Sequence, residues 1–379
     1  MANEIETFDA SDPSSHDPAL KRILNIKQRV TASDPRSIPP DPDSIASSLF
    51  RSNFTSTQRT FCTDAATVTA RVSPTLKDLD GNPIGTLGFF DSENEIDAVR
   101  KLLAAASEYL LGHGCRSIVG PIDGDTWHKY RINVGPLGGQ SDWPFLLEPH
   151  NPDYYQRMFI DSGFEVVSRY HSRQVDNLTQ TIAEMKPSFE AAAAAGYTLR
   201  PLAPDAFEQE LKVIYDLSTR CFSGNFLYEH ISQDEFIGLY ANAKKITRER
   251  LVWFAMDPKK NEVGFLFALP DCYRPIHSMR GKQNWLAKAK FAMNLLLVKA
   301  VNFKSIAVLP EHRRNRLAGA MMYQAYVESH KMGFAAANLC LIRDGNHSEQ
   351  LDGGNSRLLR RYELYQTPGS RLINFDNDR

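Results

Sequence analysis

The chain has 379 residues, of which 42% are hydrophobic and 23% charged, and its formal net charge is −1. This length exceeds one average domain, and the composition is typical of a soluble globular protein with apolar residues for two cores. The balanced charge gives no overall basic field, which argues against DNA as a partner.

The N-terminus and the cysteines suggest where the protein resides. Residues 1–19 are acidic, polar and rich in Asp, Ser and Pro, which predicts a disordered tail and not a signal peptide. No uninterrupted apolar run approaches the roughly 20 residues of a membrane span. The five cysteines are scattered, without a CxxC pair, so we expect neither a disulfide framework nor a metal site. Together these features predict a cytoplasmic protein.

The elements of the first half follow from residue type and spacing. Residues 19–30 have helical periodicity, and the short β-branched and aromatic segments within residues 57–91 predict strands. Residues 96–114 predict a long helix that ends at glycine, and "RSIVGPI" predicts the next strand.

The second half repeats this order after residues 177–196, which we interpret as a linker that contains a helix. A strand, two helices, a hairpin around "PKKN" and a strand at 302–310 precede a helix predicted for residues 313–331. The buried strand "FAAANLCLI" then follows Gly333. Both halves therefore contain a strand, a long helix, a glycine and a second strand, which indicates duplication of one fold unit.

We predict an α/β fold of two units, each a mixed twisted sheet flanked by helices. The expected boundaries are a tail at 1–19, an N-terminal unit at 20–176, a linker at 177–196 and a C-terminal unit at 197–379.

Three arginines mark the start of the helix in the second half, in the stretch "VLPEHRRNRLAGAMM". A helix N-terminus carries a partial positive charge, so Arg313, Arg314 and Arg316 are unfavourable there unless an anion offsets them. Free backbone N–H groups at such a place bind anions. The corresponding turn of the first half, "FFDSENEIDAV", is acidic and would repel phosphate. The contrast favours an anion site in the second half, and a solvated surface is the alternative.

This stretch resembles the signature of the GNAT superfamily of acyl-CoA-dependent N-acyltransferases. That signature is a strand, a Pro-containing segment, and Arg/Gln-x-x-Gly-x-Gly/Ala at the start of a helix that binds the CoA pyrophosphate. Arg313 and Ala318 match its first and last positions, whereas Arg316 replaces a glycine. In the first half, "GFF", "GP", "HNPDYY" and "GF" occur in the order typical of the two-GNAT-domain group. The resemblance covers most of residues 57–365.

The resemblance implies that the C-terminal unit binds acetyl-CoA, or another acyl-CoA, as co-substrate and that the N-terminal unit is degenerate. It places the oxyanion donor on the backbone of Ala307 or Val308. The residues it implies for cofactor binding are Ala307, Val308, Arg313, Arg314, Asn315, Arg316, Leu317, Ala318, Gly319 and Asn346.

Candidates for proton transfer are less specific. Tyr362 and Tyr365 are candidates to protonate the thiolate leaving group, with core packing as the alternative for each. Glu229 and Asp344 are candidate bases, and a solvated surface carboxylate is the alternative for both.

Two further stretches carry charge. "GPIDGDTWHKYR", residues 120–131, has a spacing that does not suit a metal site, and it is either a substrate-facing loop between the halves or a capped turn. Residues 274–316 hold ten Lys/Arg against one acid, Glu311. A helix packed beside the CoA site is the plainer interpretation of this basic stretch, and a membrane-surface or nucleic-acid contact is the alternative.

The predicted function is an acyl-CoA-dependent N-acyltransferase, with acetyl as the expected acyl group and a small-molecule or peptide amine as acceptor. One alternative is an aminoacyl-tRNA-dependent aminoacyl transferase with a tandem GNAT fold, in which the basic stretch contacts tRNA. The other is a non-catalytic protein that binds CoA or another metabolite.

Overall fold

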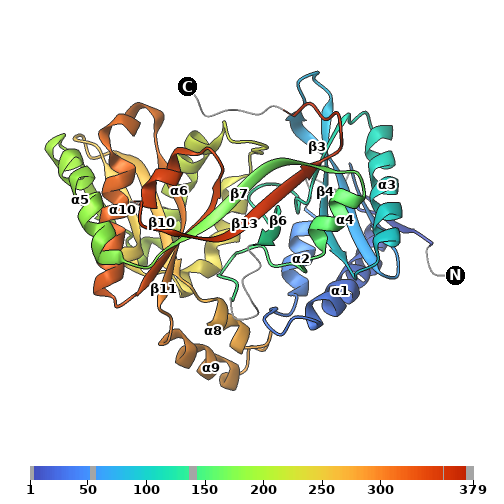
Figure 1. Cartoon of the computed structure of the whole chain (residues 1–379), viewed down its shortest axis with the longest axis horizontal. Helices are drawn as coiled ribbons and strands as arrows, with labels where there is room; N and C mark the ends of the chain where they lie inside the picture. The colour runs from blue at the N-terminus through green and yellow to red at the C-terminus, as the bar shows by residue number, and fades with distance from the viewer. Residues whose placement is uncertain (1–3, 52–56, 136–142, 353, 373–379) are drawn as a thin grey trace.

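The computed structural model describes residues 4–51, 57–135, 143–352 and 354–372. These residues form two α/β halves that lie side by side and share one continuous sheet (Figure 1). The strand order is β1-β2-β3-β4-β5-β13-β7-β12-β11-β10-β9-β8, and β6 pairs with β13. Among the described residues, no helix combines the length and the apolar character needed to cross a membrane.

The first half contains seven strands and four α-helices among the described residues up to Val175. Its strands are β1 Glu6–Asp9, β2 Gln58–Cys62, β3 Ala66–Lys77, β4 Pro83–Ser92, β5 Ser117–Gly120, β6 Ile132–Gly135 and β7 Glu165–Val175. Its helices are α1 His16–Ala32, α2 Pro42–Leu49, α3 Ile96–Gly112 and α4 Tyr155–Asp161.

The second half follows the same plan. Its strands are β8 Thr198–Pro201, β9 Val252–Met256, β10 Glu262–Pro270, β11 Ala300–Val308, β12 Ala336–Arg343 and β13 Arg357–Gln366. Its helices are α5 Leu178–Ala194, α6 Phe207–Phe222, α7 Gln233–Tyr240, α8 Tyr273–Ser278, α9 Trp285–Leu295 and α10 Leu317–Lys331, and the short 3-10 helix η6 Pro310–Asn315 precedes α10. The segment predicted as a linker is α5, which packs along α10.

The duplicated unit is present in both halves and confirms the predicted fold class. In the first half β4 leads through α3 to β5, and the two strands pair in parallel. In the second half β11 leads through α10 to β12, again in parallel. Each crossover helix covers its sheet with an apolar face, since Leu102 and Leu103 of α3 and Met321 and Ala325 of α10 are all buried.

Two long strands cross the boundary between the halves. β7, at the end of the first half, pairs with β12 of the second half, where Val175 lies opposite Ala337. β13, at the end of the chain, pairs with β5 of the first half, where Tyr365 lies opposite Gly120. β7 and β13 also pair with each other in antiparallel register along most of their length (Figure 1). β13, from the end of the chain, therefore extends the sheet of the first half, and β7 extends the sheet of the second half.

Two predicted boundaries differ from the structure. Residues 6–19, predicted as disordered, form β1, a 3-10 turn and the start of α1, because β1 pairs with β2 through Thr7 and Phe61. The long helix of the second half begins at Leu317 and not at residue 313, because Arg316 adopts a left-handed backbone conformation (φ 55°) that an α-helix cannot contain.

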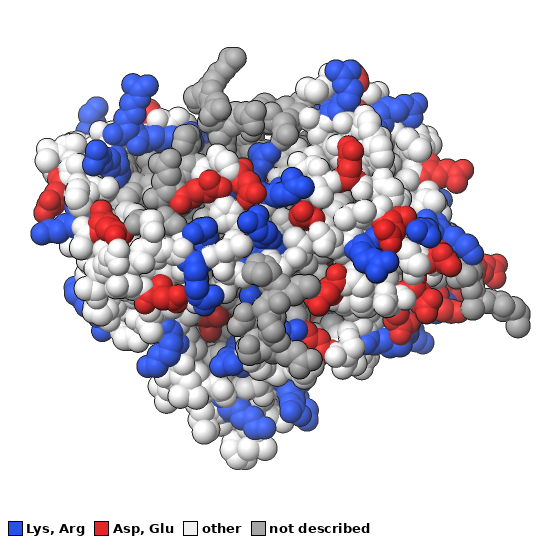
Figure 2. Space-filling view, viewed as in Figure 1, with Lys and Arg blue, Asp and Glu red and all other residues white. Residues whose placement is uncertain are grey.

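The basic stretch also differs from its plainer prediction. α9 leaves much of its apolar surface exposed: Trp285 is 75% exposed and Met293 68% exposed, although Ala287 is buried. In Figure 2 the lower projection formed by α8 and α9 carries basic and uncharged side chains. One side of α9 still reaches the interior, since Lys288 and Phe291 line the cavity described below.

The exchange of β7 and β13 predicts that neither half folds alone. A fragment of residues 1–176 lacks β13, and a fragment of residues 177–379 lacks β7, so each exposes unpaired sheet edges beside a buried core. We expect each fragment expressed alone to show no cooperative thermal unfolding by circular dichroism. Co-expression of the two fragments should restore a cooperative transition. A cooperative transition in either single fragment would contradict this prediction.

Candidate active site

The two parallel strands of the second half diverge after a short paired segment. β11 and β12 pair only as far as Phe303 and Leu339. On its other edge β11 shows a bulge at the same level, since Ser305 and Phe303 face consecutive residues of β10 and Lys304 is the extra residue. Leu341 of β12 adopts a left-handed conformation with φ of 62°. From Ser305 to Val308, β11 therefore has an edge that pairs with no strand of the described residues, and a slot opens beside it.

The equivalent slot of the first half is closed. β4 and β5 pair only from Ile84 to Thr86 on β4, but beyond this point the backbone N–H of Ile122 donates to the carbonyl of Leu87 at 2.7 Å. A Cβ at Gly88 would lie 2.0 Å from the carbonyl oxygen of Ile122, which shows how closely the two backbones approach. The chain itself fills this slot, so a ligand has no room there.

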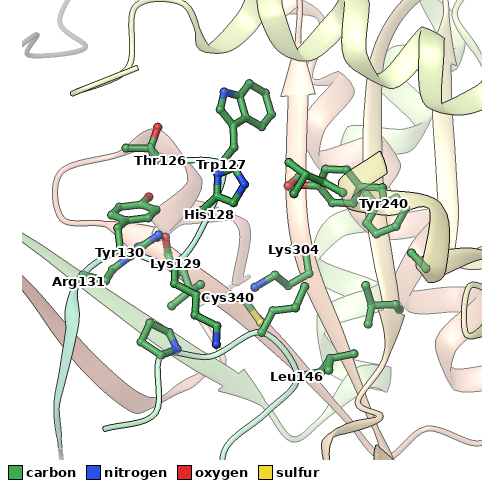
Figure 3. Close-up of a pocket in the computed structure, with 18 of the residues that line it drawn as sticks. Thr126, Trp127, His128, Lys129, Tyr130, Arg131, Leu146, Tyr240, Lys304 and Cys340 are labelled. Atoms are coloured by element: carbon green, nitrogen blue, oxygen red, sulfur yellow. Dashed lines mark hydrogen bonds between the residues drawn. The ribbon is translucent and has the colours of Figure 1, made fainter. Parts of the chain in front are cut away.

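The open slot leads into a cavity of about 1290 Å³ between the two halves (Figure 3). The loop Thr126–Arg131 of the first half forms one wall. Ser305 and Ile306 of β11 and the segment 340–343 of β12 form the facing wall. This confirms that the loop singled out in the sequence faces the space between the halves.

The arginine turn lies at the outer end of the open strand. Arg313, Arg314 and Arg316 are exposed, and none forms an ion pair with a carboxylate among the described residues. Arg316 occupies the glycine position of the GNAT signature and adopts the left-handed conformation that glycine favours. The side chain therefore does not prevent the tight turn. Asn315 donates to the Tyr197 hydroxyl at 2.9 Å, which holds the turn against β8.

The corresponding turn of the first half is neutralised and covered by α1. Lys27 of α1 lies 2.8 Å from the carboxylate of Asp91, and Arg29 lies 3.1 Å from that of Glu93. The acidic residues are thus held by cations of the same chain, and the two turns differ as their sequences predict.

The structure separates the residues predicted for cofactor binding into three places. Ala307 and Val308 are buried between the cavity and the arginine turn. Asn346 lines the cavity and also accepts from Ser348, so it caps its own loop. Gly319 faces α5, because a Cβ there would lie 2.8 Å from Ser188, and helix packing explains this glycine better than ligand approach. Leu317 is buried at the start of α10, and Ala318 is half-buried beside it.

Four predicted proton-transfer residues lie away from the cavity wall. The Tyr362 hydroxyl donates to the buried Glu148, and the Tyr365 hydroxyl donates to Glu363. Asp344 accepts from His171 at 2.7 Å in a separate small pocket.

Glu229, the fourth, pairs with Arg71 and accepts from Ser73 at 2.7 Å. Both members of the ion pair are at most 5% exposed. The pair joins β3 to the loop before α7, which is a structural role.

His128 lines the cavity, and the sequence alone assigned it no role. Its Nδ1 lies 2.8 Å from the Asp125 carboxylate, and its Nε2 has no hydrogen-bond partner among the described residues. Asp125 also accepts from Arg51 at 2.7 Å. Burial opposes the ionisation of Asp125, but these two contacts outweigh it and hold the pKa of the carboxyl below its ordinary value. An ionised Asp125 favours the tautomer with the proton on Nδ1, which leaves Nε2 to accept a proton.

The signal for His128 was the Asp-x-x-His spacing within the loop 120–131, which places both side chains on one turn. The sequence could not show that this turn faces a cavity, because the opposite wall comes from β11 and β12, more than 170 residues away in the chain.

The Arg71–Glu229 pair gives a stability prediction. Removing one partner leaves an uncompensated buried charge, so we expect Glu229→Ala to lower the free energy of unfolding by about 3 kcal/mol in chemical denaturation. Glu249→Ala, at an exposed carboxylate of the same half, is the matched control and should change it by less than about 0.5 kcal/mol. Equal stability of the two variants would remove the structural role of Glu229.

The comparisons with known proteins bear on the fold. No protein-family model and no curated protein matches the chain. Among solved structures, it is similar to the GCN5-related glucosamine N-acetyltransferase region of a fungal multi-domain GH3 β-N-acetylglucosaminidase (TM-score 0.52, 12% identity, 97% of this chain). The chain spans 38% of the length of that protein.

Two other solved structures match most of this chain at similarly low sequence identity. A GCN5-related N-acetyltransferase from Anabaena variabilis matches at a TM-score of 0.50 and 9% identity, over 96% of this chain and 72% of that one. A tandem GNAT protein from the clavulanic acid biosynthesis pathway matches at 0.48 and 13% identity, over 96% and 98%. Identities this low bear on the fold alone. The chain has the fold of the GNAT superfamily, in a two-domain arrangement.

Proposed function

We propose that the protein is an acyl-CoA-dependent N-acyltransferase that transfers an acetyl group to a small-molecule or peptide amine, and that it acts in the cytoplasm. The observation that carries this proposal is the contrast between the two slots: the one beside β11 opens into the cavity, and its counterpart beside β4 is filled by Ile122. We accordingly assign acyl-CoA to the C-terminal half and give the N-terminal half the role of shaping the acceptor side.

The residues around the open slot fit acyl-CoA, which would supply an activated thioester. Arg313, Arg314 and Arg316 offer exposed cations without carboxylate partners, next to the free N–H groups at the start of α10. The open edge of β11 leads from this turn to the cavity, so backbone N–H groups near Ala307 and Val308 can orient a carbonyl and stabilise the charge that develops on its oxygen.

His128 is the proposed general base. Asp125 holds its ring through Nδ1, and the ring lines the cavity with Nε2 available. As the amine nitrogen bonds to the carbonyl carbon and the C–S bond breaks, His128 accepts the proton that the nitrogen loses. Tyr362, Tyr365 and Glu229 have no part in this proposal, since other buried groups already occupy them.

Cofactor binding is tested by calorimetric titration of the intact protein with acetyl-CoA. We expect micromolar affinity, which corresponds to about −8 kcal/mol. The double variant Arg313→Ala/Arg314→Ala should bind at least tenfold more weakly, because it loses charge-assisted contacts to phosphate. A control variant of another exposed basic pair outside the cavity wall, Lys259→Ala/Lys260→Ala, should bind as the wild type does.

The outcomes separate the proposal from its alternatives. Absence of acetyl-CoA binding, together with steeply salt-dependent tRNA binding, would favour the aminoacyl transferase. Tight acetyl-CoA binding without thiol release over a broad panel of amines would favour a non-catalytic binding protein.

The role of His128 is tested by thiol release. His128→Gln should lower kcat by roughly a hundredfold or more, because general base catalysis contributes about 10²–10⁴-fold. The affinity for acetyl-CoA should stay unchanged, since the substitution is remote from the arginine turn. His330→Gln, at an exposed histidine of α10, is the control. Wild-type turnover in His128→Gln would remove this residue from the mechanism.

A further inference from the structure

The wall of the cavity carries an excess of positive charge. Seven Lys and Arg side chains of the described residues line it, against two carboxylates. The basic residues are Lys27, Lys129, Arg131, Lys245, Lys288, Lys304 and Arg343, and the acids are Asp91 and Asp123. Asp91 is already paired with Lys27, and Asp123 accepts from the backbone N–H of Phe89 at 2.6 Å. Among the described residues, neither Arg131 nor any of the other lysines of the wall forms an ion pair with a carboxylate.

Arg131 is the most constrained of these cations. It is 8% exposed, and its guanidinium lies between two tyrosine rings, 3.7 Å from the centre of Tyr130 and 4.1 Å from that of Tyr170. Its Nη1 donates to the carbonyl of Leu341 at 3.3 Å, but Nε has no partner and no carboxylate pairs with the side chain among the described residues. The residue also adopts a left-handed backbone conformation (φ 70°), which is unfavourable for a side chain of this size. A buried guanidinium without a counter-charge is costly and calls for an anion.

Lys304 faces the same part of the cavity from the opposite wall (Figure 3). It is the extra residue of the β11 bulge, and bulges redirect side chains in this way. No hydrogen bond or ion pair involves its ammonium group among the described residues, and the ammonium lies 5.8 Å from the centre of the Phe145 ring. Burial lowers the pKa of Lys304 and the charge of Arg131 lowers it further, which together outweigh the opposing effects of Cys340, Glu148 and Asp271.

The acids near this pair are engaged elsewhere. Glu148 accepts from Tyr362 and from the backbone of Phe145, and burial raises its pKa to about 7. Asp271 accepts from the backbone N–H of Leu146 at 2.8 Å, and burial raises its pKa too. Neither carboxyl lies within ion-pair distance of Arg131 or Lys304.

We infer that Arg131 and Lys304 form a subsite for an anionic group, a carboxylate or a phosphate, carried by a substrate of this protein. A fork-shaped guanidinium held over two rings and an ammonium group with no hydrogen bond or ion pair among the described residues together suit both anions. The position of this anion beside the transferred acyl group rests on the proposed function, whereas the binding of an anion in the cavity does not.

The phosphates of CoA do not account for this charge. Their proposed binding residues, Arg313, Arg314 and Arg316, lie outside the cavity wall, at the far end of the open strand edge. The anion belongs either to the acyl group, as a second carboxylate, or to the acceptor amine.

Direct binding tests the inference without any enzymatic activity. Succinate and inorganic phosphate serve as probes, with sodium chloride at matched ionic strength as the reference, and the readout is the thermal unfolding temperature. We expect at least one probe to raise this temperature in the wild type and in Arg313→Ala/Arg314→Ala. The rise should disappear in Arg131→Met/Lys304→Met, and Arg131→Lys should retain part of it.

Folding of the double variant is checked in the same scans without a probe. Its transition should remain cooperative, because among the described residues neither side chain forms an ion pair that the substitutions would break. If it does not fold, Lys304→Met alone should lower the affinity for the effective probe at least tenfold. A probe effect that is lost in Arg313→Ala/Arg314→Ala, or that is absent from the wild type, overturns the inference.

Matched substrate pairs then identify the carrier of the anion. Succinyl-CoA is compared with acetyl-CoA by calorimetry, and thiol release from acetyl-CoA is compared between amino acids and their amides and between glucosamine 6-phosphate and glucosamine. The anionic member of one pair should be preferred at least tenfold in binding or in kcat/KM, and Arg131→Met/Lys304→Met should abolish that preference. Activity with neutral members and no preference in any pair would overturn the inference while leaving the acyl transfer in place. If the protein neither binds acetyl-CoA nor releases thiol, the proposed function is wrong. The probe experiment still tests the anion subsite in that case.

Discussion

The antiparallel pairing of β7 with β13 is the constraint on which the rest of the structure depends. It joins two duplicated units into one sheet and fixes the position of the cavity, because the facing walls come from opposite sides of this pair. Tyr170 of β7 contributes to the cavity wall and contacts Arg131, so the seam between the halves also positions the loop 126–131. A site built across a seam of backbone hydrogen bonds is held more rigidly than one built between two separately folded domains.

In the two copies of the unit, the slot between the diverging parallel strands is open in one and closed in the other. Parallel strands that diverge leave an edge of backbone N–H and C=O groups that need partners. In the first half Ile122 supplies such a partner to β4, and Lys27 and Arg29 neutralise the acidic turn that follows. In the second half the edge of β11 stays open and the turn stays basic. The same constraint on the backbone thus produces a structural core in one copy and a candidate binding site in the other.

The sequence predicts those features that depend on residues close together in the chain. Helical spacing, the glycine stops and the arginines after β11 revealed the duplication and the difference between the two turns. The roles of Tyr362 and Glu229 depend instead on partners far away in the chain: Arg71 and Glu229 are 158 residues apart, and Tyr362 and Glu148 are 214 apart. No local pattern records such pairs, so buried and catalytic roles looked alike. His128 was hidden for the same reason, since its spacing to Asp125 is local but the wall it faces is not.

The charge of the cavity bears on specificity as well as on binding. A neutral acceptor would leave Arg131 and Lys304 without a counter-charge in a site that the acceptor closes to water, whereas an anionic one would satisfy both. Sites whose buried polar groups stay unpaired with the wrong substrate discriminate far more strongly than apolar pockets that differ by a methylene group. In our proposal the arginine turn binds the phosphates of CoA, so the second cationic centre acts on the choice of acyl group or acceptor. The proposed division gives cofactor binding to the turn after β11 and substrate selection to the bulge within β11, so both proposed sites are built on one strand and the turn that follows it.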